Sequence, residues 1–240
     1  MSDPQSMKQL LPHTWRQALK RRLFAVRDMT TRLQTLRRAG FRCTGAIDAG
    51  AYRGDWTREF WGVFPQVPVL MVEPQPASQP QLRGLAASVA GSEVLAAALS
   101  DQAGSVSFHL QESNSGIRVG PSSPEGAISV PCTTLAATLE ERGRFAPNLL
   151  KLDLQGHELQ ALRGAGDQLS RFEVIICEIS LIPIGGVPIF AEVNHFFEEH
   201  GYRFYDVLPQ YNRPLDGALW QVDAFYVRRD SVLIASSAWA

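Results

Sequence analysis

The residues with the clearest chemical meaning run from Ile47 to Gly54 and read Ile-Asp-Ala-Gly-Ala-Tyr-Arg-Gly. An apolar stretch ends at the acidic Asp48, and Gly50 and Gly54 follow it. Glycines at such positions let the backbone approach a ligand closely and adopt dihedral angles that side chains forbid. The loop lacks the Gly-x-Gly-x-x-Gly spacing of a pyrophosphate site, and a carboxylate beside it would repel a pyrophosphate. It suits a ligand with an ammonium and a positive sulfonium, as in S-adenosylmethionine, although an ordinary strand–helix turn is the alternative.

A second acidic residue, Glu73, lies 19 residues after Gly54, where the next strand is expected to end. In Rossmann-like sites an acid at about this distance accepts the hydroxyl groups of a ribose. NAD-dependent enzymes use the same arrangement, so Glu73 indicates a ribose without choosing the cofactor.

A third group of polar residues begins in a strand expected at 149–154 and includes Lys151, Asp153, Gln155 and His157. Ligands bind outside the carboxyl ends of parallel strands, so these residues are placed to reach an acceptor molecule. Glu178, near the end of the following strand, belongs to the same rim. We take His157 as the first candidate for a general base, with Asp153 and Glu178 as orienting groups or metal ligands. Two carboxylates without a third ligand do not predict a metal site, and a solvent-facing His157 at the start of a helix is the alternative.

Alternating strand and helix signals are expected to position these residues. Buried strands are expected at 44–48, 67–72, 94–99, 149–154 and 174–179, and helices at 55–64, 76–90, 134–142, 157–169 and 190–200. Further strands are expected at 106–110 and 128–132, on either side of a loop over 113–126. Two final strands, 202–207 and 218–228, have no helix between them and should pair antiparallel. The pattern predicts an α/β, Rossmann-like fold with a mostly parallel seven-stranded sheet and an antiparallel closing strand.

The N-terminal part of the chain differs in charge from the rest. Residues 1–40 hold nine Lys or Arg and two acidic residues, so of the 23 basic and 24 acidic side chains the other 200 residues hold 14 and 22. Apolar residues recur at helical spacing over 14–38, ahead of Gly40. Such a basic segment is typical of binding to nucleic acid, to an anionic membrane or to an acidic substrate. The alternative is a solvated helix that packs through its apolar face. We therefore divide the chain into a basic helical extension (1–40), a main domain (41–230) and a tail (231–240), and a lid or a homodimer contact through the extension is a further prediction.

The composition limits the other classes of protein. Cys43, Cys132 and Cys177 lie far apart, which predicts neither a disulfide framework nor a zinc site and suits a reducing, cytoplasmic location. No apolar run has the length of a membrane span, and no apolar stretch follows the N-terminal charges as in a secretory signal.

At this point the chain resembles the FkbM family of methyltransferases. The family hallmark is Lys-x-Asp-x-Glu-Gly-x-Glu running on to Leu-x-Gly-Ala, and the sequence from Lys151 to Ala165 matches it closely. Gln155 departs from the pattern because it stands where an acidic residue is usual. The glycine loop, Glu73-Pro74 and the segment from Ala98 to Gly104 follow the family's order, so the resemblance covers about 44–205.

The resemblance implies a class I methyltransferase fold and methyl transfer from S-adenosylmethionine, commonly to a hydroxyl of a sugar or natural-product scaffold. It implies that the methionine end of the donor lies near the glycine loop and its ribose near Glu73. It also implies that the adenine lies near Ser100 and Asp101, although Asp101 reads equally well as a turn residue. The residues assigned to the cofactor are Asp48, Gly50, Tyr52, Gly54, Glu73, Ser100, Asp101 and Asp153.

Three other classes of protein compete with this interpretation. An NAD(P)-dependent oxidoreductase would use Glu73, but the missing Gly-x-Gly-x-x-Gly and the antiparallel closing pair argue against it. A nucleic-acid methyltransferase would use the basic extension, but the strand end at Asp153 lacks the Asn/Asp-Pro-Pro-aromatic signature of amino-methylating enzymes. A non-catalytic binding module would not need the glycine loop and Glu73 together. The expected partner is a small-molecule or glycan hydroxyl acceptor rather than nucleic acid.

Overall fold

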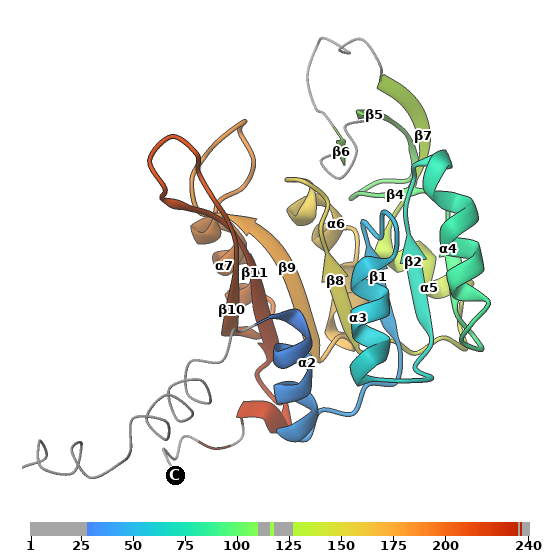
Figure 1. The fold of residues 1–240 in the computed structure, drawn as a ribbon, viewed down its shortest axis with the longest axis horizontal. Coiled ribbons are helices and arrows are strands. Elements are labelled where there is room, and N and C mark those ends of the chain that lie inside the picture. Colours follow the sequence, from blue (N-terminus) through green and yellow to red (C-terminus); the bar gives the residue numbers. More distant parts are fainter. Residues whose placement is uncertain (1–27, 110–115, 118–126, 235, 237–240) are drawn as a thin grey trace, which may run out of the picture.

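The computed structural model describes residues 28–109, 116–117, 127–234 and 236. Its centre is a seven-stranded sheet in the order β10-β11-β9-β8-β1-β2-β3 (Figure 1). The strands of this sheet are β1 (Ala46–Ala49), β2 (Val69–Val72), β3 (Glu93–Leu95), β8 (Leu149–Leu152), β9 (Val174–Ser180), β10 (Tyr202–Asn212) and β11 (Leu219–Arg228). The helices are α2 (Met29–Arg38), α3 (Asp55–Val63), α4 (Gln79–Ala86), α5 (Leu135–Glu141), α6 (Glu158–Arg163) and α7 (Phe190–Glu199), with short 3₁₀ turns at Pro76–Ser78, Gly166–Arg171 and Val232–Ile234.

The pairing of the strands confirms the predicted fold class. β1 pairs in parallel with β2 and β8, β2 with β3, and β8 with β9. β11 pairs antiparallel with both β9 and β10, so it alone runs against the other strands of this sheet. Helices connect the parallel strands because a parallel crossover needs a connection of a dozen or more residues.

Two apolar cores lie on the two faces of the sheet because successive strand residues point to opposite sides. In β1, Ala46 packs into the core formed with α2, α3 and α4, whereas Ile47 and Ala49 pack into the core formed with α5, α6 and α7. Figure 1 shows the first set of helices in front of the sheet and the second set behind it. The sheet is therefore covered by helices on both faces, as is usual for parallel sheets.

A second, four-stranded sheet in the order β4-β7-β5-β6 corrects the prediction of one strand over 94–99. That segment divides into β3 in the main sheet and β4 (Ala98–Leu99) in the second sheet. The remaining strands of the second sheet are β5 (Gly104–His109), β6 (Gly116–Ile117) and β7 (Ala127–Thr133). β6 lies inside the segment 113–126, which the sequence predicts to be a loop. The rest of that segment lies outside the described residues.

Glycines set two helix ends, one of them differently from the prediction. Gly54, with φ +79°, is the residue before the first turn of α3, and Asp55 begins the helix as expected. The single helix expected over 157–169 is divided in the structure into α6 and a separate 3₁₀ turn over Gly166–Arg171. Gly164 follows α6, and a Cβ there would lie 2.0 Å from the carbonyl oxygen of Ser100. The close approach of these two segments therefore requires glycine at position 164.

The described part of the N-terminal extension packs against the main domain. Met29, Leu33 and Leu36 of α2 are buried in the same core as α3 and β11. Arg32 forms an ion pair with Asp206 of β10 and donates to the carbonyl of Val207 at 2.8 Å. The apolar face of residues 29–38 is thus covered within the chain, and the rest of the basic extension lies outside the described residues. In the described part of the chain, no helix has the length and apolar character needed to cross a bilayer.

Candidate functional site

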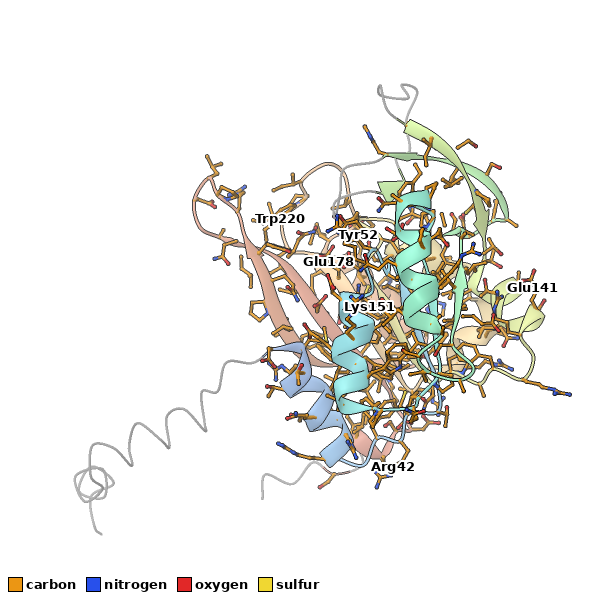
Figure 2. All side chains as sticks on the ribbon, turned by 45° about the vertical axis from the view of Figure 1, so that its right-hand side comes forward. Arg42, Tyr52, Glu141, Lys151, Glu178 and Trp220 are labelled. Carbon is orange, nitrogen blue, oxygen red and sulfur yellow. The ribbon has the colours of Figure 1, made fainter. Side chains whose placement is uncertain are left out.

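A row of charged residues crosses one face of the main sheet near the carboxyl ends of its parallel strands. Asp48 of β1, Lys151 of β8, Glu178 of β9 and Asp223 of β11 each stand at positions whose neighbours two residues away pack toward α2 and α3. Alternation therefore points all four side chains to that face of the sheet. All four residues are buried. Figure 2 shows Tyr52, Lys151 and Glu178 gathered at this end of the sheet.

Lys151 lies between two carboxylates and compensates part of their charge. Its Nζ is 3.0 Å from Asp153 Oδ2 and 3.8 Å from Asp48 Oδ1. Burial alone would lower the pKa of the Lys151 ammonium, but Asp153, Asp48 and Asp223 raise it above its ordinary value. The lysine therefore stays charged, as a buried ammonium can only when carboxylates surround it.

Asp48 lies beneath the glycine loop rather than at its surface. The side chain is fully buried, and its Oδ2 accepts a 2.6 Å hydrogen bond from the Thr57 hydroxyl on α3. Burial raises the pKa of Asp48, and Lys151 and Thr57 oppose the shift. The carboxylate links β1, β8 and α3, so it holds the loop from below.

The glycine loop fits closely against the end of β8. Gly50 has φ +81°, and a Cβ at this position would lie 1.9 Å from the carbonyl oxygen of Asp153. Gly54 has φ +79°, and a Cβ there would lie 2.4 Å from the side chain of Leu85. Both glycines are therefore favoured by a positive φ and by close packing: a side chain at position 50 would require a shift of the backbone, and one at position 54 a shift of Leu85.

Glu73 follows β2 and organises two neighbouring backbone segments. Its Oε2 accepts from the Tyr52 amide and its Oε1 from the Gln75 amide, each at 2.8 Å. Burial raises the pKa of Glu73, and these amide hydrogen bonds oppose the shift. Each carboxylate oxygen has two acceptor positions, so both oxygens retain capacity for a ligand hydroxyl.

Gln155 connects the end of β8 with β9. It has φ +54°, and its side-chain amide donates to Asp153 Oδ1 at 2.8 Å and to Glu178 Oε2 at 3.1 Å. The two hydrogens of one amide thus serve two carboxyl groups. Burial and then the charges of Asp153, Glu158 and Asp223 raise the pKa of Glu178 to about 9.

Glu158 holds the turn that carries Gln155. Its Oε1 accepts from the amides of Leu154 and Gly156 at 2.8 and 3.2 Å. The side chain is buried, and burial raises the pKa of Glu158 to about 7 despite these hydrogen bonds. The carboxyl group satisfies two amides of a buried turn, which is a structural role.

Four adjoining cavities surround these residues. The loop cavity, of about 290 Å³, is lined by Gly50, Ala51, Tyr52, Arg53, Asp55, Trp56, Glu73, Gln75, Lys151, Asp153 and Tyr211. The acidic cavity, of about 180 Å³, is lined by Met29, Trp56, Glu59, Lys151, Asp153, Glu178, Gln210, Tyr211 and Asp223. Two others extend from the loop cavity toward the second sheet, where Phe108 lines a narrow cleft with Gly50 and Glu73, and Ile128 lines a wider hollow with Tyr52. The loop and acidic cavities share Trp56, Lys151, Asp153 and Tyr211, so they form one continuous site.

The structure brings most of the predicted residues to this site and places a few elsewhere. Gly50, Tyr52, Glu73, Asp153 and Glu178 all line the cavities. Asp48 lies beneath them, and Gly54 shapes the turn into α3. The roles of these residues in binding a ligand stay predictions.

His157, Ser100 and Asp101 form a separate group that lines none of these four cavities. His157 Nε2 is 2.8 Å from Ser100 Oγ, and Ser100 Oγ is 3.1 Å from Asp101 Oδ1. His157 is buried, not solvent-facing, and burial lowers the pKa of its imidazole while Asp101 opposes the shift. The imidazole is thus bonded to Ser100, which follows β4, and is not among the residues that line the acidic cavity.

Sequence reasoning missed Asp223, Trp56 and Gln210 as lining residues. Asp223 alone had a signal, because a single acid stands in an otherwise apolar stretch of the last strand. A buried charge of this kind needs a partner or a function. Within the described residues, no group of three His, Cys, Asp or Glu side chains is arranged to hold a metal ion.

The sheet order, the single antiparallel strand and the cavities at the carboxyl ends of the strands define a Rossmann-like α/β domain with a ligand site. The chain belongs to the FkbM methyltransferases: the family model described as "Methyltransferase FkbM domain" matches residues 48–204. This match confirms the resemblance to that family and the expectation of a methyltransferase.

Solved structures with similar folds include three methyltransferases. The 1,6-didemethyltoxoflavin-N1-methyltransferase of Burkholderia thailandensis, solved with S-adenosylhomocysteine, is 12% identical, with 96% of this chain and 92% of that chain covered and a TM-score of 0.47. The N-methyltransferase NodS of Bradyrhizobium japonicum is 8% identical, with coverages of 83% and 93% and a TM-score of 0.47. The precorrin-6y C5,15-methyltransferase of Geobacter metallireducens is 13% identical, with coverages of 82% and 87% and a TM-score of 0.42. No curated protein matches the chain.

Proposed function

We propose that the protein transfers a methyl group from S-adenosylmethionine to a hydroxyl oxygen of a sugar or natural-product acceptor. The observation that carries the proposal is the pair of cavities that meet at Lys151 and Asp153. One is bounded by the glycine loop and Glu73, and the other by carboxyl groups. Such a pair allows a donor and an acceptor to be held side by side, which is the main requirement of a methyl transfer.

The chemistry of the loop cavity fits the donor. Glu73 offers carboxylate oxygens to a ribose diol, and Asp153 offers a negative charge to the cationic methionine end. Lys151 compensates only part of the negative charge of Asp48 and Asp153, so the site keeps an excess that favours a cation. Gly50 and Tyr52 bring backbone close to the ligand. When bound, S-adenosylmethionine supplies an electrophilic methyl group whose transfer leaves a neutral thioether.

The acidic cavity fits an acceptor that must lose a proton. An alcohol is a weak nucleophile until a base takes its proton, and a positioned carboxylate is suited to that work. Glu178 and Asp153 line this cavity, whereas His157 is turned toward Ser100. We therefore place the acceptor among the carboxyl groups, and we assign His157 to the support of the turn between β8 and α6. Trp56 and Tyr211 line both cavities at their junction.

Calorimetric titration with S-adenosylhomocysteine tests the donor assignment. Glu73→Gln is expected to weaken binding at least about tenfold, because a charged acceptor of hydrogen bonds contributes about 1.5–3 kcal/mol. Glu140→Gln, at an exposed position of α5, is the matched control and should bind as the wild type does. Binding of NAD in place of S-adenosylhomocysteine would contradict the proposal.

A screen with methyl-labelled donor tests the acceptor assignment. Purified protein is incubated with panels of glycosides, hydroxylated natural products, amines and RNA, and the labelled product is identified by mass spectrometry. Label on an oxygen of a glycoside or hydroxylated product is the expected result. Label confined to a nitrogen acceptor, or to RNA with strong salt dependence, would replace this substrate class by another.

A further inference from the structure

The acidic cavity contains two carboxyl groups that face each other across neighbouring strands. Glu178 of β9 and Asp223 of β11 are register partners in the antiparallel pair. Residues directly opposite in such a pair have Cβ atoms about 4.5–5.5 Å apart, and like charges there are destabilising. Only 7% of Glu178 and 6% of Asp223 is exposed, so water does not screen the repulsion. The pair is therefore not expected to carry two negative charges at once.

Amide groups fix one oxygen of each carboxyl group. Glu178 Oε2 accepts from Gln155 Nε2 at 3.1 Å and from Gln221 Nε2 at 3.3 Å. Asp223 Oδ2 accepts from Gln210 Nε2. Among the described residues, the second oxygen of each group has no hydrogen-bond partner, and both residues line the acidic cavity. The free oxygens are thus the ones available to a ligand in the cavity.

We propose that Glu178 and Asp223 act as a dyad that shares one proton, with Glu178 donating it in a hydrogen bond to the acceptor molecule and Asp223 serving as the base for the reacting hydroxyl. This inference rests on the proposed methyl transfer and names the catalytic base of that same site. The free Oδ1 of Asp223 receives the proton. Gln155, Gln210 and Gln221 are positioning residues because they act only through the two carboxyl groups.

The surrounding charges decide which carboxyl group keeps the proton. Burial raises the pKa of Asp223 to about 6, and Lys151 acts most strongly against that shift while Asp153 and Glu59 add to it. Glu178 has Asp153 and Glu158 as further negative neighbours, and the opposing effect of Lys151 is the smallest of its causes. At neutral pH, Glu178 is therefore protonated and Asp223 ionised. Two like groups whose surroundings separate their pKa values form an acid and a base.

The transfer balances with these residues alone and the two substrates. The acceptor oxygen gives its proton to Asp223 Oδ1 and forms the new O–C bond. The S–C bond of the donor breaks in the same step, and its electron pair stays on sulfur, which becomes a neutral thioether. The positive charge of the donor and the negative charge of Asp223 disappear together, so the buried site ends with less charge than it had before. Asp223 then releases the proton to solvent when the product leaves.

Two isosteric variants separate the roles of the dyad. Glu178→Gln keeps a neutral group whose amide donates into the cavity, so it is expected to retain activity within about tenfold. Asp223→Asn removes the base and is expected to lower kcat by about 10²–10⁴. Both variants should bind S-adenosylhomocysteine as the wild type does, since neither residue lines the loop cavity. The activity is measured with the acceptor found in the methyl-labelling screen.

Infrared difference spectroscopy tests the proton itself without any acceptor. In difference spectra of the wild type against each variant at neutral pH, in which other buried carboxyl groups such as Glu158 cancel, the C=O stretch of a protonated, buried carboxyl group should be lost in Glu178→Gln and retained in Asp223→Asn. A band that persists in Glu178→Gln and disappears in Asp223→Asn would reverse the assignment and overturn the proposal. Loss of activity in Glu178→Gln with activity retained in Asp223→Asn would overturn it equally. Failure of the wild type to bind S-adenosylhomocysteine would instead refute the proposed function and leave the infrared result to decide the dyad.

Discussion

Replacing Gly50 by alanine tests how the glycine loop is held against the central strand. The new Cβ would lie 1.9 Å from the Asp153 carbonyl oxygen and 2.9 Å from its carbon, whereas ordinary contacts begin at 3.4 Å. Backbone atoms cannot rotate away, so the loop or the end of β8 must shift. Gly50 also has φ +81°, where a side chain costs about 1–2 kcal/mol. Overpacking adds about 1–3 kcal/mol, so the expected loss of folding free energy is about 2–5 kcal/mol.

Thermal unfolding and calorimetry with S-adenosylhomocysteine measure the two consequences. A loss of about 2–5 kcal/mol lowers the Tm of a domain of this size by roughly 4–20 °C. Affinity for S-adenosylhomocysteine should fall at least about tenfold, because the shifted loop lines the loop cavity. The loss of affinity should persist well below the Tm, where the variant is folded.

Two other glycines separate the contributions to this effect. Gly166 has φ +50° with no atom within 4 Å of its Cβ position, so Gly166→Ala measures backbone strain alone. Gly62 in α3 has open space and helical dihedral angles, so Gly62→Ala should stabilise the protein by about 0.5–1 kcal/mol. If Gly50→Ala unfolds and binds like Gly166→Ala, the close contact with Asp153 plays no part and the reasoning is refuted.

Three further predictions concern the charged residues. Lys151→Met leaves the buried Asp48 without its cation, so urea unfolding should show a loss of about 3–5 kcal/mol. For Glu158, the folded pKa of about 7 lies above the unfolded value of 4.5, so the folded state holds the extra proton and stability falls as the pH rises from 4.5 through 7. Glu158→Gln should remove that slope, which urea unfolding at a series of pH values measures, and an unchanged slope would assign it to another group. Gln155→Glu places a third carboxyl group between Asp153 and Glu178. The variant should therefore lower the Tm more above neutral pH than below it.

The glycine loop and Glu73 were predictable because their signals are local. A positive φ at Gly50 and Gly54 depends on a few neighbouring residues, and an acid at a strand end appears in the sequence beside the strand itself. Strand alternation also predicts which face of β8 carries Lys151 and Asp153. The main sheet followed from the same local periods, together with the rule that parallel strands need helical crossovers.

The surroundings of His157 depend on contacts between distant segments, which the local spacing of apolar residues does not predict. Its hydrogen-bond partner, Ser100, lies 57 residues earlier in the chain. Their contact requires the division of the 94–99 segment between two sheets, which brings Ser100 over Gly164. A single strand through that segment would have continued in the main sheet, and the prediction of one strand therefore could not place His157.

Asp223 was missed for a reason that lies in the direction of its strand. Sequence reasoning looked for functional residues at the C-terminal ends of strands, because parallel strands bring those ends to one edge. An antiparallel strand brings its N-terminal half to that edge instead. β11 runs from Leu219 to Arg228, so Gln221 and Asp223, near its start, lie opposite Ser180 and Glu178 at the end of β9. Prediction of the antiparallel closing strand thus already implied that its early polar residues face the site, and the same inversion applies wherever one reversed strand neighbours a parallel sheet.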